Sequence, residues 1–161
     1  MEAAAFTAVT EQYQDMVYRI SLAQLGNPQD AEDAAQEVFF KLYRQKNPLE
    51  GNALRYWLIR VTVNHCRDVL KSPWRKRRVS VSELTAISEE PVFAMEEQQA
   101  LFHAVMALQE SDRTVLYLFY YEDMTVREIA DLLKVSISAV TTRLSRARKR
   151  LKETLEGWQD G

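Results

Sequence analysis

Apolar residues recur every three to four positions along most of this chain, which is the spacing of amphipathic helices. The first such stripe begins at Phe6 and ends before the helix-stopping sequence Gly26-Asn27-Pro28. A second helix is expected to open at Pro28 or Asp30, where acidic residues suit the positive end of a helix. A third is expected from about residue 53 to residue 71. Valine, isoleucine and threonine never alternate long enough to predict a strand, so the sequence predicts an all-α fold.

These three helices predict a first small domain over residues 1–71, with a core made from the apolar stripe of each helix. The pattern breaks over residues 72–94, where serine and proline interrupt it and the charge turns from basic to acidic. Such a segment is typical of a flexible linker. Helices resume from about Met95, so a second small helical domain is predicted over residues 95–161.

The second domain ends in a pattern that is typical of a helix-turn-helix. Thr125 begins a capping box because Glu128 follows at the third position after it, and Ser136 is a good N-cap for the next helix. Ser111 is expected to cap the helix before this pair. In a helix-turn-helix the second helix lies in the major groove, and its first turns meet base edges. The pattern therefore indicates DNA recognition.

Basic residues on the last predicted helix strengthen this interpretation. No acid interrupts the run, whose members are Arg143, Arg146, Arg148, Lys149, Arg150 and Lys152. A solvated helix face usually mixes charges of both signs, whereas a run of one sign favours contacts with phosphates. The alternative is a helix that packs only on its own core or on a partner protein, and the pattern alone leaves that alternative open.

The third predicted helix carries a polar stripe opposite its apolar face. The stripe consists of Tyr56, Arg60, Asn64, Arg67 and Lys71. Such residue types suit nucleic acid, because arginine meets phosphates, asparagine can hydrogen-bond base edges and an aromatic ring stacks on an exposed base. An ordinary solvated face is the alternative that the stripe by itself leaves open.

Composition excludes several classes of protein. The net charge is −2 and 47% of the residues are apolar, so the chain can form a core although its acids and bases gather in separate segments. Cys66 is the only cysteine, which excludes an internal disulfide and a cysteine-based zinc site. His65 and His103 have no partner pattern, so neither a metal site nor a catalytic histidine is predicted.

Membrane and enzyme signals are missing from the sequence as well. No apolar run approaches about 18 residues, and the N-terminus lacks the pattern of a signal peptide, so a cytoplasmic protein is predicted. There is no glycine-rich phosphate loop and no nucleophile with a plausible base. An enzyme is therefore not expected, and no cofactor is predicted.

Taken together, three segments of the chain resemble bacterial RNA polymerase sigma factors of the extracytoplasmic-function (ECF) group of the sigma-70 family. They are DAEDAAQEVF at 30–39, YWLIRVTVN at 56–64 with Asp68, and EIA at 128–130 with residues 136–151. The resemblance extends from Phe6 to about Leu155. It implies a bundle like sigma region 2, a flexible linker, and a helix-turn-helix domain like sigma region 4. Lys134 stands where family members often carry glycine, so about 1–2 kcal/mol of strain or a differently shaped turn is expected there.

The resemblance implies binding roles for three sets of residues and no catalytic or metal-binding roles. The set expected to dock on core RNA polymerase is Asp33, Gln36, Glu37, Phe40, Lys41 and Arg44. The set expected to hold the melted −10 element, with the loop 47–52, is Asn52, Tyr56, Trp57, Arg60, Asn64, Arg67 and Lys71. The set expected to read or flank the −35 element as duplex is Ser136, Ser138, Thr141, Thr142, Arg143, Ser145, Arg146, Arg148 and Lys149.

The implied function is promoter-specific transcription initiation as a subunit of the polymerase. Its implied partners are core RNA polymerase through the β′ clamp helices and the β flap, promoter DNA, and an anti-sigma factor that can be membrane-tethered. No small-molecule substrate is expected. Two alternatives are a helix-turn-helix regulator that binds an operator without joining the polymerase, and a helical adaptor that binds only proteins. Addition of core polymerase distinguishes the regulator, which does not confer initiation on bare core enzyme. Salt-dependent promoter binding within the holoenzyme would exclude the adaptor.

Overall fold

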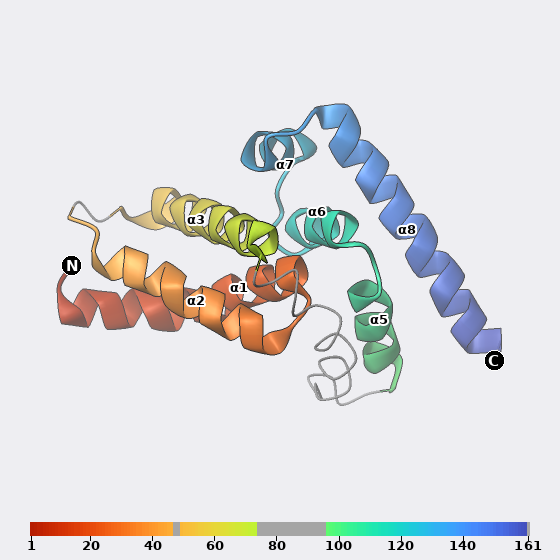
Figure 1. The fold of residues 1–161 in the computed structure, drawn as a ribbon, viewed down its shortest axis with the longest axis horizontal. Helices are drawn as coiled ribbons and strands as arrows, with labels where there is room; N and C mark the ends of the chain where they lie inside the picture. Colours follow the sequence, from red (N-terminus) through yellow and green to blue (C-terminus); the bar gives the residue numbers. More distant parts are fainter. Residues whose placement is uncertain (47–48, 74–95, 161) are drawn as a thin grey trace. The chain divides into compact units, whose positions relative to one another are not determined.

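The computed structural model describes residues 1–46, 49–73 and 96–160, and every regular element within these ranges is an α-helix (Figure 1). The all-α prediction is confirmed for these residues. The chain divides into two compact units, Met1–Val79 and Ser80–Gly161. Most of the predicted linker, 72–94, lies outside the described residues, as do residues 47–48 of the predicted loop.

The first unit contains three helices: α1 (Ala3–Leu25), α2 (Pro28–Tyr43) and α3 (Gly51–Lys71). Gly26 closes α1 in the left-handed region, with φ of 72°, which glycine adopts without steric cost. Asn27 caps α2, because its Oδ1 accepts a hydrogen bond of 3.0 Å from the N–H of Asp30. Pro28 then occupies the first turn, where its missing N–H costs nothing. The predicted opening of the second helix is therefore confirmed.

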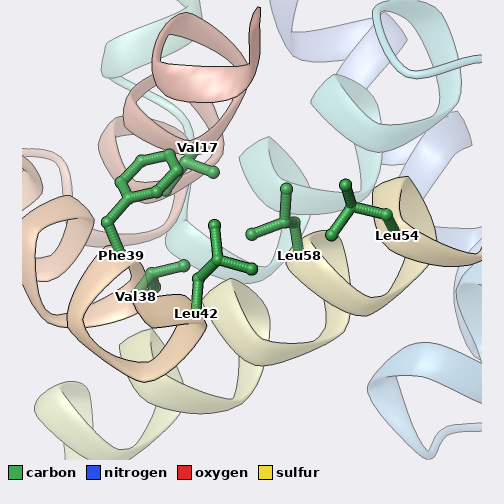
Figure 2. Packing of buried hydrophobic residues seen from close by; sticks show 6 residues of the cluster. All are labelled: Val17, Val38, Phe39, Leu42, Leu54 and Leu58. Carbon is green, nitrogen blue, oxygen red and sulfur yellow. The ribbon is translucent and has the colours of Figure 1, made fainter. Parts of the chain in front are cut away.

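The core of the first unit is built from one face of each of its helices. Figure 2 shows six buried side chains that converge there from α1, α2 and α3: Val17, Val38, Phe39, Leu42, Leu54 and Leu58. Burial of each such side chain contributes roughly 1.5–3 kcal/mol relative to exposure. A smaller cluster contains Cys66, which is fully buried and packs like a small apolar residue. The apolar stripes predicted from the sequence thus form the core.

The second unit contains α5 (Glu96–Met106), α6 (Glu110–Tyr120), α7 (Val126–Leu133) and α8 (Ile137–Asp160). The three shorter helices all pack against α8. Figure 1 shows α7 beside the first turns of α8 and α5 beside its later turns. The inner face of α8 supplies Val140, Leu144 and Ala147, all of which are buried. Because the other three helices pack on the inner face of α8, the outer face of α8 remains exposed to solvent.

The helix-turn-helix formed by α7 and α8 has the capping that its sequence predicts. The N–H of Glu128 donates to Oγ1 of Thr125 at 3.1 Å, and the N–H of Thr125 donates to Oε1 of Glu128 at 3.0 Å. Ser136 accepts a hydrogen bond of 3.0 Å at its Oγ from the N–H of Ala139. Both helix starts are therefore fixed by local hydrogen bonds.

The prediction that Ser111 caps α6 is wrong. Gln109 is the N-cap, because its carbonyl oxygen accepts the first helical hydrogen bond from the N–H of Arg113 at 2.9 Å. Ser111 lies inside the first turn. The guanidinium of Arg113 explains the earlier start, since it donates to the carbonyl oxygens of Met106 and Leu108 at 3.1 Å each. These bonds fix the preceding turn without a hydroxyl cap.

Lys134 sits in the turn of the helix-turn-helix with φ of 59° and ψ of 45°, which is left-handed backbone. We expect Lys134→Gly to raise the free energy of unfolding by about 0.5–1 kcal/mol, because relief of strain exceeds the greater entropy of glycine in the unfolded chain. Urea unfolding followed by circular dichroism measures the change. Lys152→Gly, in the regular part of α8, is the control and should cost about 1 kcal/mol. A loss of stability in both variants would contradict a left-handed Lys134.

Candidate nucleic-acid interface

The first turns of α8 present short hydroxyl side chains to solvent. Thr142 lies near the centre of this outward face, because it is about 200° around the helix axis from buried Val140. Short polar side chains suit a helix that enters a major groove, where base edges offer hydrogen-bond donors and acceptors. The exposed hydroxyl residues at this end of α8 are Ser136, Ser138, Thr141, Thr142 and Ser145.

Two arginines of α8 are held by the two ends of α6. Arg146 donates from Nε and Nη2 to the two carboxylate oxygens of Asp112, at 2.8 and 2.7 Å. Arg148 donates from Nε to the hydroxyl oxygen of Tyr120 at 2.6 Å. Its guanidinium also lies 5.6 and 5.4 Å from the ring centroids of Phe119 and Tyr120. The two arginines are therefore fixed in orientation by α6. Both belong to the set predicted to read or flank the −35 element.

The remaining cations of the predicted −35 set are Lys149 and Arg143, which differ in their exposure to solvent. Lys149 is exposed on the outward side of α8, and Arg143 is half-buried at its flank. Asp112 raises the pKa of Arg146 above its ordinary value, first through the hydrogen bonds and then through charge attraction. A guanidinium is charged at any working pH in any case, so Arg146 and Asp112 form a lasting ion pair.

One face of α3 brings an aromatic ring, a cation and an amide into line. Tyr56, Arg60 and Asn64 are all exposed and follow one another at intervals of one turn. The guanidinium carbon of Arg60 lies 5.8 Å from the ring centroid of Tyr56. This arrangement offers a stacking surface, a cation for a phosphate and a hydrogen-bonding amide on one surface.

The other residues of the predicted −10 set surround this face. Asn52 and Lys71 are exposed near the two ends of α3, and Arg67 is half-buried. Trp57 is half-buried, and its ring packs against the core cluster of the first unit. Burial, followed by the charge of Lys41, lowers the pKa of His65. The imidazole is therefore neutral at pH 7, and the positive charge along α3 comes from arginine and lysine.

The outward face of α2 carries an exposed aromatic side chain among charged ones. Phe40 is 60% exposed. Arg44 spans this face: its Nη2 lies 3.6 Å from Oε1 of Glu37, and its Nε donates to the carbonyl oxygen of Phe40 at 3.3 Å. Asp33 and Gln36 are exposed on the preceding turns, and Lys41 is half-buried. A groove of about 480 Å³ between α1 and α2 runs beside this face, with Phe40 on its wall.

The structure shows that Asp112 and Tyr120 bind two arginines of the predicted −35 set, which the sequence patterns did not identify. Their partners lie 34 and 28 residues away in the chain, so no local spacing could reveal the pairs. The one available signal was the acidic residue Asp112 in the first turn of α6. An acid at that position is also explained by its favourable interaction with the positive N-terminal end of the helix.

The residues that the structure describes contain neither a metal-binding cluster nor a membrane-spanning helix. Among those residues, no three side chains of the metal-binding types lie close enough to hold an ion. Within the same part of the chain, no helix combines the length and the apolar character needed to cross a bilayer.

Comparisons with known proteins match both units. The family model described as Sigma-70 region 2 matches residues 9–76, and the model described as Sigma-70, region 4 matches residues 98–151. The chain is 29% identical over 166 residues to the ECF RNA polymerase sigma factor SigW of Bacillus subtilis, covering 94% of this chain and 89% of that protein. It is also 29% identical over 169 residues to the RNA polymerase sigma-H factor of Pseudomonas aeruginosa, covering 94% and 86%.

Two solved structures share the fold. The sigma factor RpoE, in complex with the anti-sigma factor NepR from Bartonella quintana, aligns with a TM-score of 0.72 at 22% identity, covering 94% of this chain and 97% of that one. CnrH, in complex with the cytosolic domain of CnrY, aligns with a TM-score of 0.58 at 20% identity, covering 97% and 90%.

Proposed function

Because the chain belongs to the ECF group of the sigma-70 family, we propose that it binds core RNA polymerase and directs initiation at particular promoters. It reads the −35 element as duplex and holds the −10 element as a melted strand. An operator-binding regulator is not favoured, because the first unit matches sigma region 2 and the second matches sigma region 4.

The observation that carries the proposal is the outward face of α8. Exposed hydroxyl groups, a fixed arginine and an exposed lysine lie on the helix that follows the capped turn. A major groove about 12 Å wide admits such a helix, and each good base contact contributes about 1–3 kcal/mol of discrimination. We assign Thr141, Thr142 and Ser145 to base edges and Lys149 to phosphate. Arg148, which is bound to Tyr120, is assigned to the packing of α8 on α6.

The α3 face supplies the second DNA contact. Opening a duplex costs about 1.4 kcal/mol of stacking per step, and stacking of a freed base on an aromatic side chain returns about 1–3 kcal/mol. The adjacent ring of Tyr56 and guanidinium of Arg60 suit that exchange. Asn64, exposed one turn further on, can hydrogen-bond the freed base.

The α2 face is the proposed polymerase contact. Exposed aromatic and arginine side chains are enriched among residues that dominate protein interfaces, and Phe40 and Arg44 provide both. Neither unit then needs to bind DNA tightly by itself, because the polymerase holds both near the promoter and raises their effective concentration. A net charge of −2 agrees with weak binding of DNA by the free chain.

This assignment divides the chain into residues 1–71 for polymerase and the −10 element, residues 95–161 for the −35 element, and residues 72–94 as the tether. An anti-sigma factor that covers the α2 and α8 faces is part of the proposal, since the sigma factor RpoE, which shares the fold, was solved in complex with the anti-sigma factor NepR. The chain would act in the cytoplasm, where the polymerase is.

Transcription from a random promoter library tests the proposed function. Purified core polymerase with this chain should start transcripts from a subset of the library that core polymerase alone does not use. Sequencing of that subset gives the −35 and −10 elements. A chain that binds selected duplexes without polymerase, and starts no transcript with it, would instead be an operator-binding regulator.

Asn64→Ala should impair strand opening more than promoter binding. We expect about a fivefold loss of permanganate reactivity at thymines of the −10 element, because one hydrogen bond to a melted base contributes about 1 kcal/mol. The exposed position makes a folding defect unexpected. A template with a pre-melted −10 segment should recover most of the activity, and Gln12→Ala, which truncates an exposed amide on α1, should behave as wild type. Unchanged opening in Asn64→Ala would remove this residue from the −10 role.

A further inference from the structure

Asp112 is a buried carboxylate to which the proposed function gives no role. Its side chain is 3% exposed, whereas that of its partner Arg146 is 50% exposed. Both of its oxygens accept hydrogen bonds from Arg146. A carboxylate at this depth needs a paired cation, since breaking a buried pair leaves an uncompensated charge. The arginine is thus held from within the unit while half of it faces solvent.

The geometry of the pair determines which part of Arg146 is available. A guanidinium has five N–H donors in a rigid planar fork. The edge formed by Nε and Nη2 is occupied by Asp112. The end formed by Nη1 and the second hydrogen of Nη2 makes no hydrogen bond to any described residue. Arg146 also lies one turn after Thr142, on the same outward side of α8.

The pairing also changes what the arginine can contribute to DNA binding. Asp112 offsets the charge of Arg146, which weakens its general attraction to phosphates. The directional hydrogen bonds of its free end remain, and they are already oriented, so little side-chain entropy is lost on binding. Two parallel donors match the O6 and N7 acceptors that guanine presents in the major groove.

We infer that Asp112 is a positioning residue that, through Arg146, makes α8 selective for guanine at one position of the −35 element. This inference rests on the proposed function of α8 as the −35 reader. Asp112 itself does not touch the DNA. It acts by holding the guanidinium so that its free end is presented on the outward face beside Thr142.

Base preference within the holoenzyme tests the inference. Wild-type holoenzyme is used to select −35 sequences from a randomised duplex, and initiation is then measured on templates that differ at single positions. Asp112→Ala and Arg146→Ala should each reduce the preference for guanine at one and the same position by about tenfold. The double variant should lose no more than either single variant, because the two residues act as one unit.

Two further variants separate positioning from stability of the fold. Tyr120→Phe removes the hydrogen bond between the other end of α6 and Arg148, and it should keep the guanine preference. Arg146→Lys keeps a cation beside Asp112 but loses the fork, and it should lose the preference. Because the Arg146 side chain is half exposed, this variant tests the geometry even where Asp112→Ala fails to fold.

The outcomes distinguish the inference from the function on which it rests. Wild-type holoenzyme without any −35 preference would overturn the proposed function. A wild-type guanine preference that survives in both Asp112→Ala and Arg146→Lys would overturn the inference alone. Equal loss of initiation at every −35 sequence in Asp112→Ala, with the preference intact, would assign Asp112 to the stability of the fold.

Discussion

Thr142→Glu is expected to reduce −35-dependent initiation about 100-fold. Thr142 is exposed at the centre of the outward face of α8, opposite buried Val140. A glutamate there removes a base contact worth about 1–3 kcal/mol and places a negative charge between two phosphate backbones. The substitution leaves the buried side of α8 unchanged, so the helix should still fold. Initiation by reconstituted holoenzyme on a selected promoter measures the effect.

Thr154→Glu is the matched control, because it makes the same change at an exposed position of the same helix. It lies about three turns further along α8, beyond the part assigned to the major groove. Its initiation rate should stay within about twofold of wild type, since a single exposed charge outside the groove has little effect. An equal loss in both variants would attribute the defect to net charge and would argue against base reading by the first turns of α8.

Phe40→Asp is expected to weaken binding to core RNA polymerase by about 30-fold or more. Aromatic side chains at the centre of an interface commonly contribute 2 kcal/mol or more, which corresponds to about 30-fold. An aspartate would also bring an unpaired charge into the contact. Since Phe40 is 60% exposed in the free chain, its replacement removes little buried apolar surface from the first unit. Titration of fluorescently labelled chain with core enzyme gives the dissociation constant.

Gln12→Asp provides the control for this variant. It adds one negative charge at an exposed position of α1 in the same unit, and it should bind core polymerase like wild type. Thermal unfolding of both variants should match that of the unsubstituted chain. Wild-type affinity in Phe40→Asp would show that polymerase docks elsewhere on the chain.

Local signals in the sequence were sufficient for the helix-turn-helix. The capping box at Thr125 and the cap at Ser136 depend on side chains that bond to backbone within three residues, so residue spacing alone predicts them. The start of α6 shows the limit of the same reasoning. Gln109, Glu110 and Ser111 are all polar, and the choice among them follows from hydrogen bonds of Arg113 that the spacing does not reveal.

The roles of long side chains were less accessible to prediction. Helical periodicity predicts the side of the helix on which Trp57 and Arg148 lie. It does not predict which neighbouring residues such long side chains contact. The ring of Trp57 packs against the core, and Arg148 bends onto the aromatic end of α6. The pair between Asp112 and Arg146 joins two helices across 34 residues. Contacts of this kind depend on packing and become visible only in the folded unit.

The burial of Cys66 allows unfolding of the first unit to be followed by chemical labelling of its thiol. Cys66 is the single cysteine in the sequence and is inaccessible in the core of the first unit. An alkylating reagent can therefore modify the chain only when this unit unfolds locally or completely. The rate of thiol labelling, measured by mass spectrometry, would therefore report the opening of the three-helix bundle alone. The second unit contains no cysteine and would contribute no signal.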